Sequence, residues 1–154
     1  MSQTLPARAD VDVRFTWNLA DIFPTDDAWR TALSRVRGQV DQLTALQGRL
    51  GASGATLRER FRLEDDLSLS VDELGNYARR KSDEDTRNPI YQEMSAQFMN
   101  LAVSMGEASA FETPELLAIP DEVLEGVFAE EPGLEHYRLA VQRVRRQKEH
   151  TLSK

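Results

Sequence analysis

Leu74-Gly-Asn-Tyr-Ala-Arg-Arg-Lys-Ser-Asp-Glu-Asp-Thr-Arg-Asn-Pro-Ile-Tyr91 is the stretch of sequence that decides the fold, because it joins two segments with helical spacing. Its acidic centre, Ser82-Asp-Glu-Asp-Thr86, is expected to stop one helix, and Asn88-Pro89 to begin the next as cap and first helical residue. Proline fits the first helical position because the N–H there lacks a partner within the helix. Short connections between long helices favour antiparallel neighbours. The sequence therefore predicts an all-α fold, an antiparallel bundle of long helices with short connecting helices.

Apolar residues recur at spacings of three and four on both sides of this stretch, which places them on one face of each predicted helix. The first helix is expected to begin at Thr25 or Asp26 and to end near Gly48 or Gly51. Ser53 caps the second helix, whose span of about 27 residues gives a rod of roughly 40 Å. The expected core positions, helix by helix, are Trp29, Leu33, Val36, Val40, Leu43; Leu63, Leu67, Val71, Leu74, Ala78, with Leu57 and Phe61 offset; and Tyr91, Met94, Phe98, Leu101, Met105.

The segments before the first helix and after the third helix are also assigned from the sequence. Residues 1–24 are expected to form a lead-in and anchoring segment, in which Phe15–Phe23 lies extended against the bundle or a neighbouring domain. Residues 25–154 form the helical N-terminal domain, and prolines divide its later part into short helices over 113–120 and 120–128. Apolar spacing then predicts a final long helix that begins with Leu134, Tyr137, Val141 and Val144.

The last residues also suggest that the domain is truncated from a longer protein. His150-Thr-Leu-Ser-Lys154 has the pattern of a further helix start, with Ser153 as its cap.

Composition narrows the class of protein. The net charge of −7 and the pI near 4.9 oppose binding to a phosphate backbone, so no nucleic-acid partner is expected. The absence of cysteine excludes thiol chemistry and thiolate metal sites. With no leader-like start and no long apolar run, no membrane partner is expected, and the predicted location is cytoplasmic.

No catalytic or metal-ligating residue is expected in this chain. The two histidines, His136 and His150, are fourteen residues apart, whereas a His-Glu-x-x-His zinc site needs them one helical turn apart. The cluster Asp83-Glu84-Asp85 does not fit a calcium loop, because Arg87 would occupy a ligand position. Nucleophile elbows and glycine-rich phosphate loops are also missing.

Two groups of residues remain as binding candidates. Tyr77, Asp83, Asp85 and Tyr91 are candidates for contacts with a substrate cleft or another domain, although core packing and helix capping explain them equally well. A basic stripe near the end of the chain fits an acidic partner or RNA, or it complements the helix dipole and pairs with Glu135 and Glu149. That stripe consists of Arg138, Arg143, Arg145, Arg146 and Lys148.

Several ordered motifs resemble the N-terminal region of oligoendopeptidase F, a bacterial member of the thimet-oligopeptidase-like zinc metallopeptidases. They include Trp17-Asn-Leu-Ala-Asp-Ile-Phe-Pro24 with Asp27-Ala-Trp29, and Asn76-Tyr-Ala78 with Lys81-Ser-Asp-Glu-Asp-Thr86 and Asn88-Pro-Ile-Tyr-Gln92. Further matches are Pro114-Glu-Leu-Leu117, Tyr137-Arg138 and Lys148-Glu-His-Thr-Leu-Ser153. The resemblance covers most of the chain.

The resemblance implies a mostly helical, clamshell-shaped enzyme in which a catalytic zinc cleaves short peptides inside a deep cleft. The zinc ligands of the family lie in its later catalytic part, so none is carried over to this chain, which we expect to be inactive alone. Zinc is the implied cofactor of the full-length parent, and the implied partners are its catalytic domain and short peptide substrates.

These helices would then form part of the cleft wall and pack against the catalytic domain. The isolated domain should expose an apolar patch that the catalytic domain covers. Two alternatives stay open: a free-standing acidic helical module that binds a partner protein, and a fragment that itself binds peptides between the second and third helices.

Overall fold

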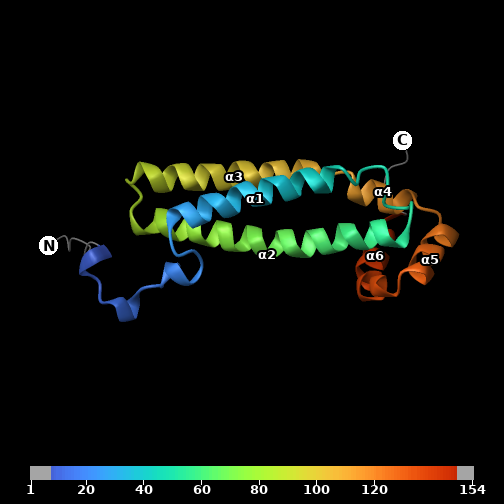
Figure 1. The fold of residues 1–154 in the computed structure, drawn as a ribbon, viewed down its shortest axis with the longest axis horizontal. Coiled ribbons are helices and arrows are strands. Elements are labelled where there is room, and N and C mark those ends of the chain that lie inside the picture. Colours follow the sequence, from blue (N-terminus) through green and yellow to red (C-terminus); the bar gives the residue numbers. More distant parts are fainter. Residues whose placement is uncertain (1–7, 149–154) are drawn as a thin grey trace.

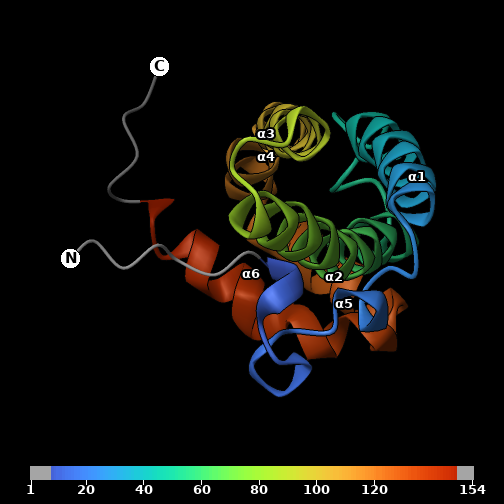
Figure 2. The same cartoon turned by 90° about the vertical axis from the view of Figure 1, so that its left-hand side faces the viewer.

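Three long helices form the body of the molecule. The computed structural model describes residues 8–148. Helices α1 (Asp26–Thr44), α2 (Gly54–Glu84) and α3 (Pro89–Ser109) lie side by side, and each runs opposite to the one before it (Figure 1). Viewed from the end, they occupy the corners of a triangle (Figure 2). The all-α antiparallel bundle is confirmed, and residues 8–148 contain no β-strand.

Shorter helices gather around one end of α2. They are α4 (Glu112–Ala118), α5 (Asp121–Glu130), the 3-10 helix η4 (Pro132–Tyr137) and α6 (Arg138–Arg145). The expected final long helix is wrong for the described residues, because Pro132-Gly133 starts a 3-10 turn and α6 ends at Arg145. The expected further helix at His150 and Ser153 lies outside the described residues.

Two separate hydrophobic cores share α2. The first lies between α1, α2 and α3 and contains the predicted α1 stripe together with Leu67, Leu74, Met94 and Leu101. Leu63, Val71, Tyr91, Phe98 and Met105 pack at its edge. The second core lies between the start of α2 and the short helices, and Leu57 and Phe61 belong to it. The offset of these two residues in sequence thus reflects a second packing surface.

Side-chain caps fix the helix starts where the sequence predicted them. The Thr25 hydroxyl accepts a hydrogen bond from the Ala28 N–H at 3.1 Å. The Ser53 hydroxyl accepts from Thr56 at 3.2 Å, and the Asn88 side chain accepts from Ile90 at 3.0 Å. Each cap satisfies one of the donors that a helix start leaves without a partner.

Helix ends differ from the prediction. Helix α1 ends at Thr44 rather than near Gly48 or Gly51, because the following turns direct backbone N–H groups to another acceptor. Glu115 of α4 accepts from Gly48 at 2.8 Å and from Leu50 at 2.6 Å. The loop is therefore held by α4. Gly48 has φ +79°, a conformation that favours glycine.

The acidic segment 82–86 does not stop α2 at its first residue. The helix continues to Glu84 and has 31 residues rather than about 27, since none of Ser82, Asp83 and Glu84 breaks a helix. Asp85 is the C-cap, and Asn88 starts α3 three residues later.

Only the last part of the segment before α1 packs on the first core, and Phe15 and Trp17, expected to lie against the bundle or another domain, are exposed. Leu19 is buried, and Ile22 and Phe23 pack against the same cluster. This segment is not wholly extended as expected, because Leu19–Asp21 forms a 3-10 turn in which Asn18 donates to the Asp21 carboxylate at 2.8 Å. In the lead-in, the described part from residue 8 also forms 3-10 turns.

No helix within residues 8–148 is long and apolar enough to span a membrane.

Candidate functional site

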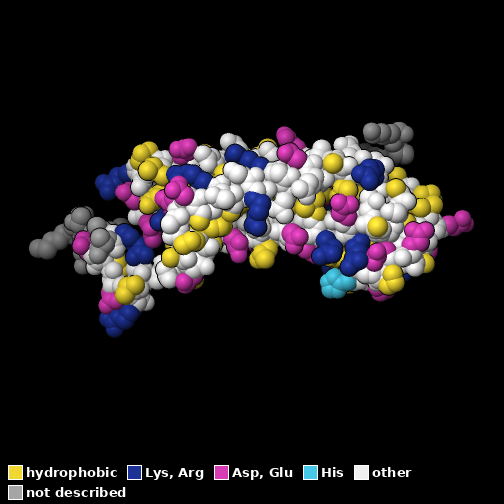
Figure 3. Space-filling model, viewed as in Figure 1, with side chains coloured by type: hydrophobic (Ala, Val, Ile, Leu, Met, Phe, Trp, Pro, Cys, Tyr) yellow, Lys and Arg dark blue, Asp and Glu magenta, His cyan; other side chains and the backbone are white. Residues whose placement is uncertain are grey.

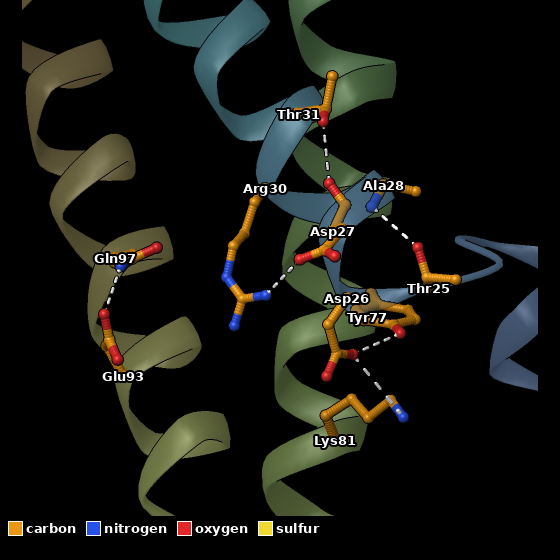
Figure 4. A network of polar contacts seen from close by, with 10 residues as sticks. All are labelled: Thr25, Asp26, Asp27, Ala28, Arg30, Thr31, Tyr77, Lys81, Glu93 and Gln97. Atoms are coloured by element: carbon orange, nitrogen blue, oxygen red, sulfur yellow. Dashed lines mark hydrogen bonds and ion pairs between the residues drawn. The ribbon is translucent and has the colours of Figure 1, made fainter.

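Tyr77 and Tyr91, two of the predicted contact residues, lie on either side of Lys81. The Tyr77 hydroxyl donates a 2.8 Å hydrogen bond to Asp26 in the first turn of α1 (Figure 4). The Lys81 ammonium lies 3.9 Å from the same carboxylate oxygen and 5.2 Å from the centre of the Tyr91 ring. Burial, and secondly the bond to Asp26, raise the pKa of Tyr77. The phenol therefore stays protonated and ties α2 to α1.

The other two predicted contact residues make local contacts at the end of α2. Asp83 is exposed and lies 3.9 Å from Arg80. Asp85 accepts a 3.0 Å hydrogen bond from the backbone N–H of Arg87, as a turn-forming aspartate does. The structure thus brings Tyr77 and Tyr91 to one cation and gives the two aspartates separate neighbours. A cleft or interdomain role for these four residues stays a prediction.

A buried charge cluster joins α4 to α2, and the sequence analysis missed it. Arg60, 5% exposed, forms ion pairs with the buried carboxylate of Glu112 and, at 2.6 Å, with Glu64. Burial raises the pKa of Glu64, and the Arg60 charge opposes that shift. Arg60 and Glu64 are four residues apart, as in many surface ion pairs, and Glu112 is far from both in sequence. Only the contact between α2 and α4 therefore reveals the cluster.

Two of the five residues of the basic stripe, Arg138 and Arg145, contact their own domain. Arg138 pairs with Glu135 at 2.9 Å, as predicted, and also with Glu125 at 3.1 Å. Arg145 donates to the carbonyl oxygens of Leu116, in α4, at 2.7 Å and of Ile119, the C-cap of α4, at 2.8 Å. Arg143, Arg146 and Lys148 are exposed. The predicted partner Glu149 lies outside the described residues.

A groove between α5 and α6 is the main concave feature near this stripe. Its volume is about 420 Å³, and its floor contains Leu124, Phe128 and Val141. The guanidinium of Arg138 lies 4.2 Å from the centre of the Phe128 ring and flanks the groove. Two carboxylates also line it, and each forms an ion pair with an arginine: Asp121 with Arg145 and Glu125 with Arg138. The groove thus offers packing surface and paired charge.

The described residues do not fit the zinc site that the resemblance implies for the parent. Within residues 8–148, no group of three or more His, Asp or Glu side chains is arranged to hold a metal ion. The His136 ring packs edge-on against Tyr137 with centroids 5.2 Å apart, and His150 lies outside the described residues.

Surface charge is mixed rather than segregated. On the face that Figure 3 shows, acidic and basic side chains are interspersed, and several basic side chains gather beside the histidine near α5 and α6. The net charge of −7 thus does not appear as one acidic patch on this face.

Comparison with known proteins places these helices in a larger context. The family model described as Oligopeptidase F matches residues 115–154. The chain is 32% identical to Oligopeptidase PepF of Bacillus subtilis over 97% of its own length. It is 30% identical to Group B oligopeptidase PepB of Streptococcus agalactiae over 95% of its length. The chain spans 22% and 24% of these two relatives, which is less than a quarter of their length.

Solved structures agree with the sequence comparison. Oligoendopeptidase-F from Enterococcus faecium matches 84% of this chain with a TM-score of 0.69 and 26% identity, and the match covers 26% of that chain. A structure from Chlamydophila abortus matches 97% of this chain with a TM-score of 0.79, but at 18% identity it shows the fold alone. From the motifs, the helical fold and these matches, we identify the chain as homologous to the N-terminal region of oligoendopeptidase F.

Proposed function

We propose that this chain is the noncatalytic N-terminal helical domain of a bacterial zinc-dependent oligoendopeptidase that hydrolyses short peptides. In this proposal it forms part of the wall of the substrate cleft and packs against the catalytic domain of the same polypeptide. One observation carries the proposal: nearly the whole chain aligns with oligopeptidases, yet it spans only 22% to 26% of their length.

The contribution of these helices would be mechanical. The long helices form a rigid surface, because two cores, a buried ion pair and three capped helix starts hold them in place. As a wall of the cleft, such a surface would restrict entry to small, unfolded peptides. Bond cleavage would belong to groups outside residues 8–148, since no group of three or more His, Asp or Glu side chains in that range is arranged to hold a metal ion. Zinc, when bound by the parent, would supply an activated water and a Lewis acid.

An antibody raised against this chain allows a direct test. The native polypeptide captured from extracts of the source cells should hydrolyse short fluorogenic peptides, and a chelator should abolish that activity. The purified 154-residue chain, which serves as the matched control, should show none. Captured polypeptide without chelator-sensitive hydrolysis would contradict the proposal.

The second candidate function is a free-standing module that binds a partner protein, and the net charge of −7 favours it because a net negative charge attracts a basic partner. In that case the antibody would capture a 17.4 kDa chain together with a stoichiometric basic partner. For the oligoendopeptidase domain we also propose a cytoplasmic location. Fractionating the source cells before capture with the antibody tests it.

A further inference from the structure

Helix α3 carries fewer charged residues than the two helices beside it. Between Glu93 and Glu107 its sequence contains no Asp, Glu, Lys or Arg, although charged residues make up 29% of the whole chain. A helix on the surface of a globular protein normally presents a charged or polar face to water, whereas a helix that is apolar all round is covered on every side. The exposed polar residues of this stretch, Asn100 and Ser104, are uncharged, so the outer side of α3 lacks the charged residues that normally face water.

The bundle covers only one side of α3. Met94 and Leu101 are 1% and 2% exposed and face the first core. On the outer side, Met99 and Val103 are 58% and 59% exposed, and Ala96 and Gly106 are also exposed. The uncharged stretch between the two glutamates is about 20 Å long at 1.5 Å per residue. A second helix could therefore pack along the whole uncharged stretch.

The outer face also has the composition of an interface core. The centres of protein interfaces are depleted of charged residues and enriched in methionine, with polar residues at the rim. Here Met99 and Val103 occupy the centre, and Glu93 and Glu107 lie at the two ends. By contrast, the exposed Leu69 of α2 lies between Asp65, Asp66 and Asp72 and is an isolated apolar residue.

Charge argues against a second copy of the chain as the occupant. Two α3 helices packed antiparallel through this face would bring Glu93 of each copy close to Glu107 of the other. Like charges placed opposite each other destabilise a contact, and each copy also carries a net charge of −7. In the Enterococcus faecium relative, by contrast, this fold makes up only 26% of the chain, so an intramolecular occupant is available.

We propose that the outer face of α3, formed by Ala96, Met99, Val103 and Gly106, is the interdomain surface against which another part of a longer oligoendopeptidase polypeptide packs. The inference rests on the proposed function and deepens it by naming the surface and its partner. The occupant presents an apolar, helix-sized surface, with cationic side chains opposite Glu93 and Glu107.

Hydroxyl-radical labelling with peptide mass spectrometry tests this surface. The 154-residue chain and the native polypeptide captured by the antibody are labelled under identical conditions. We expect the labelling rate of Met99 to fall about tenfold in the native polypeptide, because methionine oxidation follows exposure. Met94, 1% exposed, should label slowly in both samples, and Leu69, 66% exposed, should label equally in both.

The outcomes separate this inference from the proposed function. If the native polypeptide is much larger than 17.4 kDa but Met99 labels as fast as in the short chain, the surface is wrong and the proposed function stands. A native polypeptide of 17.4 kDa would overturn the proposed function and the inference with it. If the short chain sediments as a dimer in which Met99 is already protected, the occupant is a second copy.

Matched substitutions give a second test that does not depend on labelling. Met99→Glu and Val103→Glu should leave the melting temperature of the 154-residue chain nearly unchanged, because both side chains are exposed there. The same substitutions in the full-length polypeptide should lower its melting temperature. Leu69→Glu, on the charged face of α2, should change neither. Equal effects of Leu69→Glu and Met99→Glu in the longer polypeptide would overturn the proposal.

Discussion

Trp29 shows how a single side chain joins two helices of the bundle. Its ring is fully buried in the first core, and its indole N–H donates a 2.9 Å hydrogen bond to the Leu74 carbonyl oxygen. A buried indole needs such a partner, because an unsatisfied N–H in a core costs about 1–3 kcal/mol. The contact fixes the position of α1 along α2 as well as filling volume.

Gly75 allows α2 and α3 to approach closely. A Cβ at this position would lie 2.5 Å from the Phe98 ring, so Gly75→Ala should destabilise the chain by about 1–3 kcal/mol through overpacking. Gly38→Ala is the matched control, since nothing lies within 4 Å of a Cβ there. It should stabilise the exposed part of α1 by about 0.5–1 kcal/mol. Urea unfolding measures both, and equal signs would contradict the close approach.

Glu64 should make stability depend on pH. Burial raises its pKa above the unfolded value, so the folded state binds this proton more tightly. The stability that this group contributes is therefore present at low pH and is lost as pH rises through the raised pKa. Relative to Glu64→Gln, the wild type should become less stable as pH rises above the ordinary glutamate pKa, by under about 1 kcal/mol because the side chain is half exposed. Parallel pH profiles of the two proteins would contradict this.

At the scale of elements, the Arg60–Glu112 pair adds a buried ionic contact to the apolar packing of α4 against α2. Glu112→Ala leaves a buried guanidinium with only the half-exposed Glu64 as counter-ion, and should cost about 3 kcal/mol. The double variant Arg60→Met, Glu112→Leu removes both charges and should regain most of that loss. A double-mutant cycle by chemical denaturation measures the coupling. A double variant less stable than Glu112→Ala would contradict this account.

Sequence predicted elements well where the signal was local. Thr25, Ser53 and Asn88 mark the three long helix starts because a cap acts through its own neighbouring N–H groups. The end of α1 could not be read in this way, since the loop after Thr44 is held by Glu115, 65 residues further along from Leu50. The length of α2 was underestimated because acidic residues can occupy the last turn of a helix without ending it.

The candidate site was harder to predict than the fold. The sequence named Tyr77 and Tyr91 as candidate contact residues, but only the packing shows that Tyr77 is 2% exposed and bonded to Asp26. The Arg60 cluster and the uncharged outer face of α3 depend on which helix faces meet, and one sequence does not contain that information. Periodicity marks a buried stripe on a helix, and it does not show whether a second stripe is covered as well.

At the scale of the whole molecule, α2 should make unfolding cooperative because it belongs to both cores. Leu124→Ala in the second core should cost about 2–5 kcal/mol. Trp29 reports on the first core, and its fluorescence is isolated in a Trp17→Phe background, where the replaced side chain is 76% exposed. The fluorescence midpoint of Trp29 should shift together with the circular-dichroism midpoint. An unshifted Trp29 transition would mean that the two cores unfold independently.

The central claim is that these helices are one wall of a larger peptidase, and the size of the native polypeptide tests it most directly. An immunoblot of source-cell extract, probed with an antibody raised against this chain, gives that size in one experiment. We predict a band several times larger than 17.4 kDa, because the chain spans only 22% of the Bacillus subtilis relative. A single band at 17.4 kDa would contradict the claim and leave a free-standing helical module.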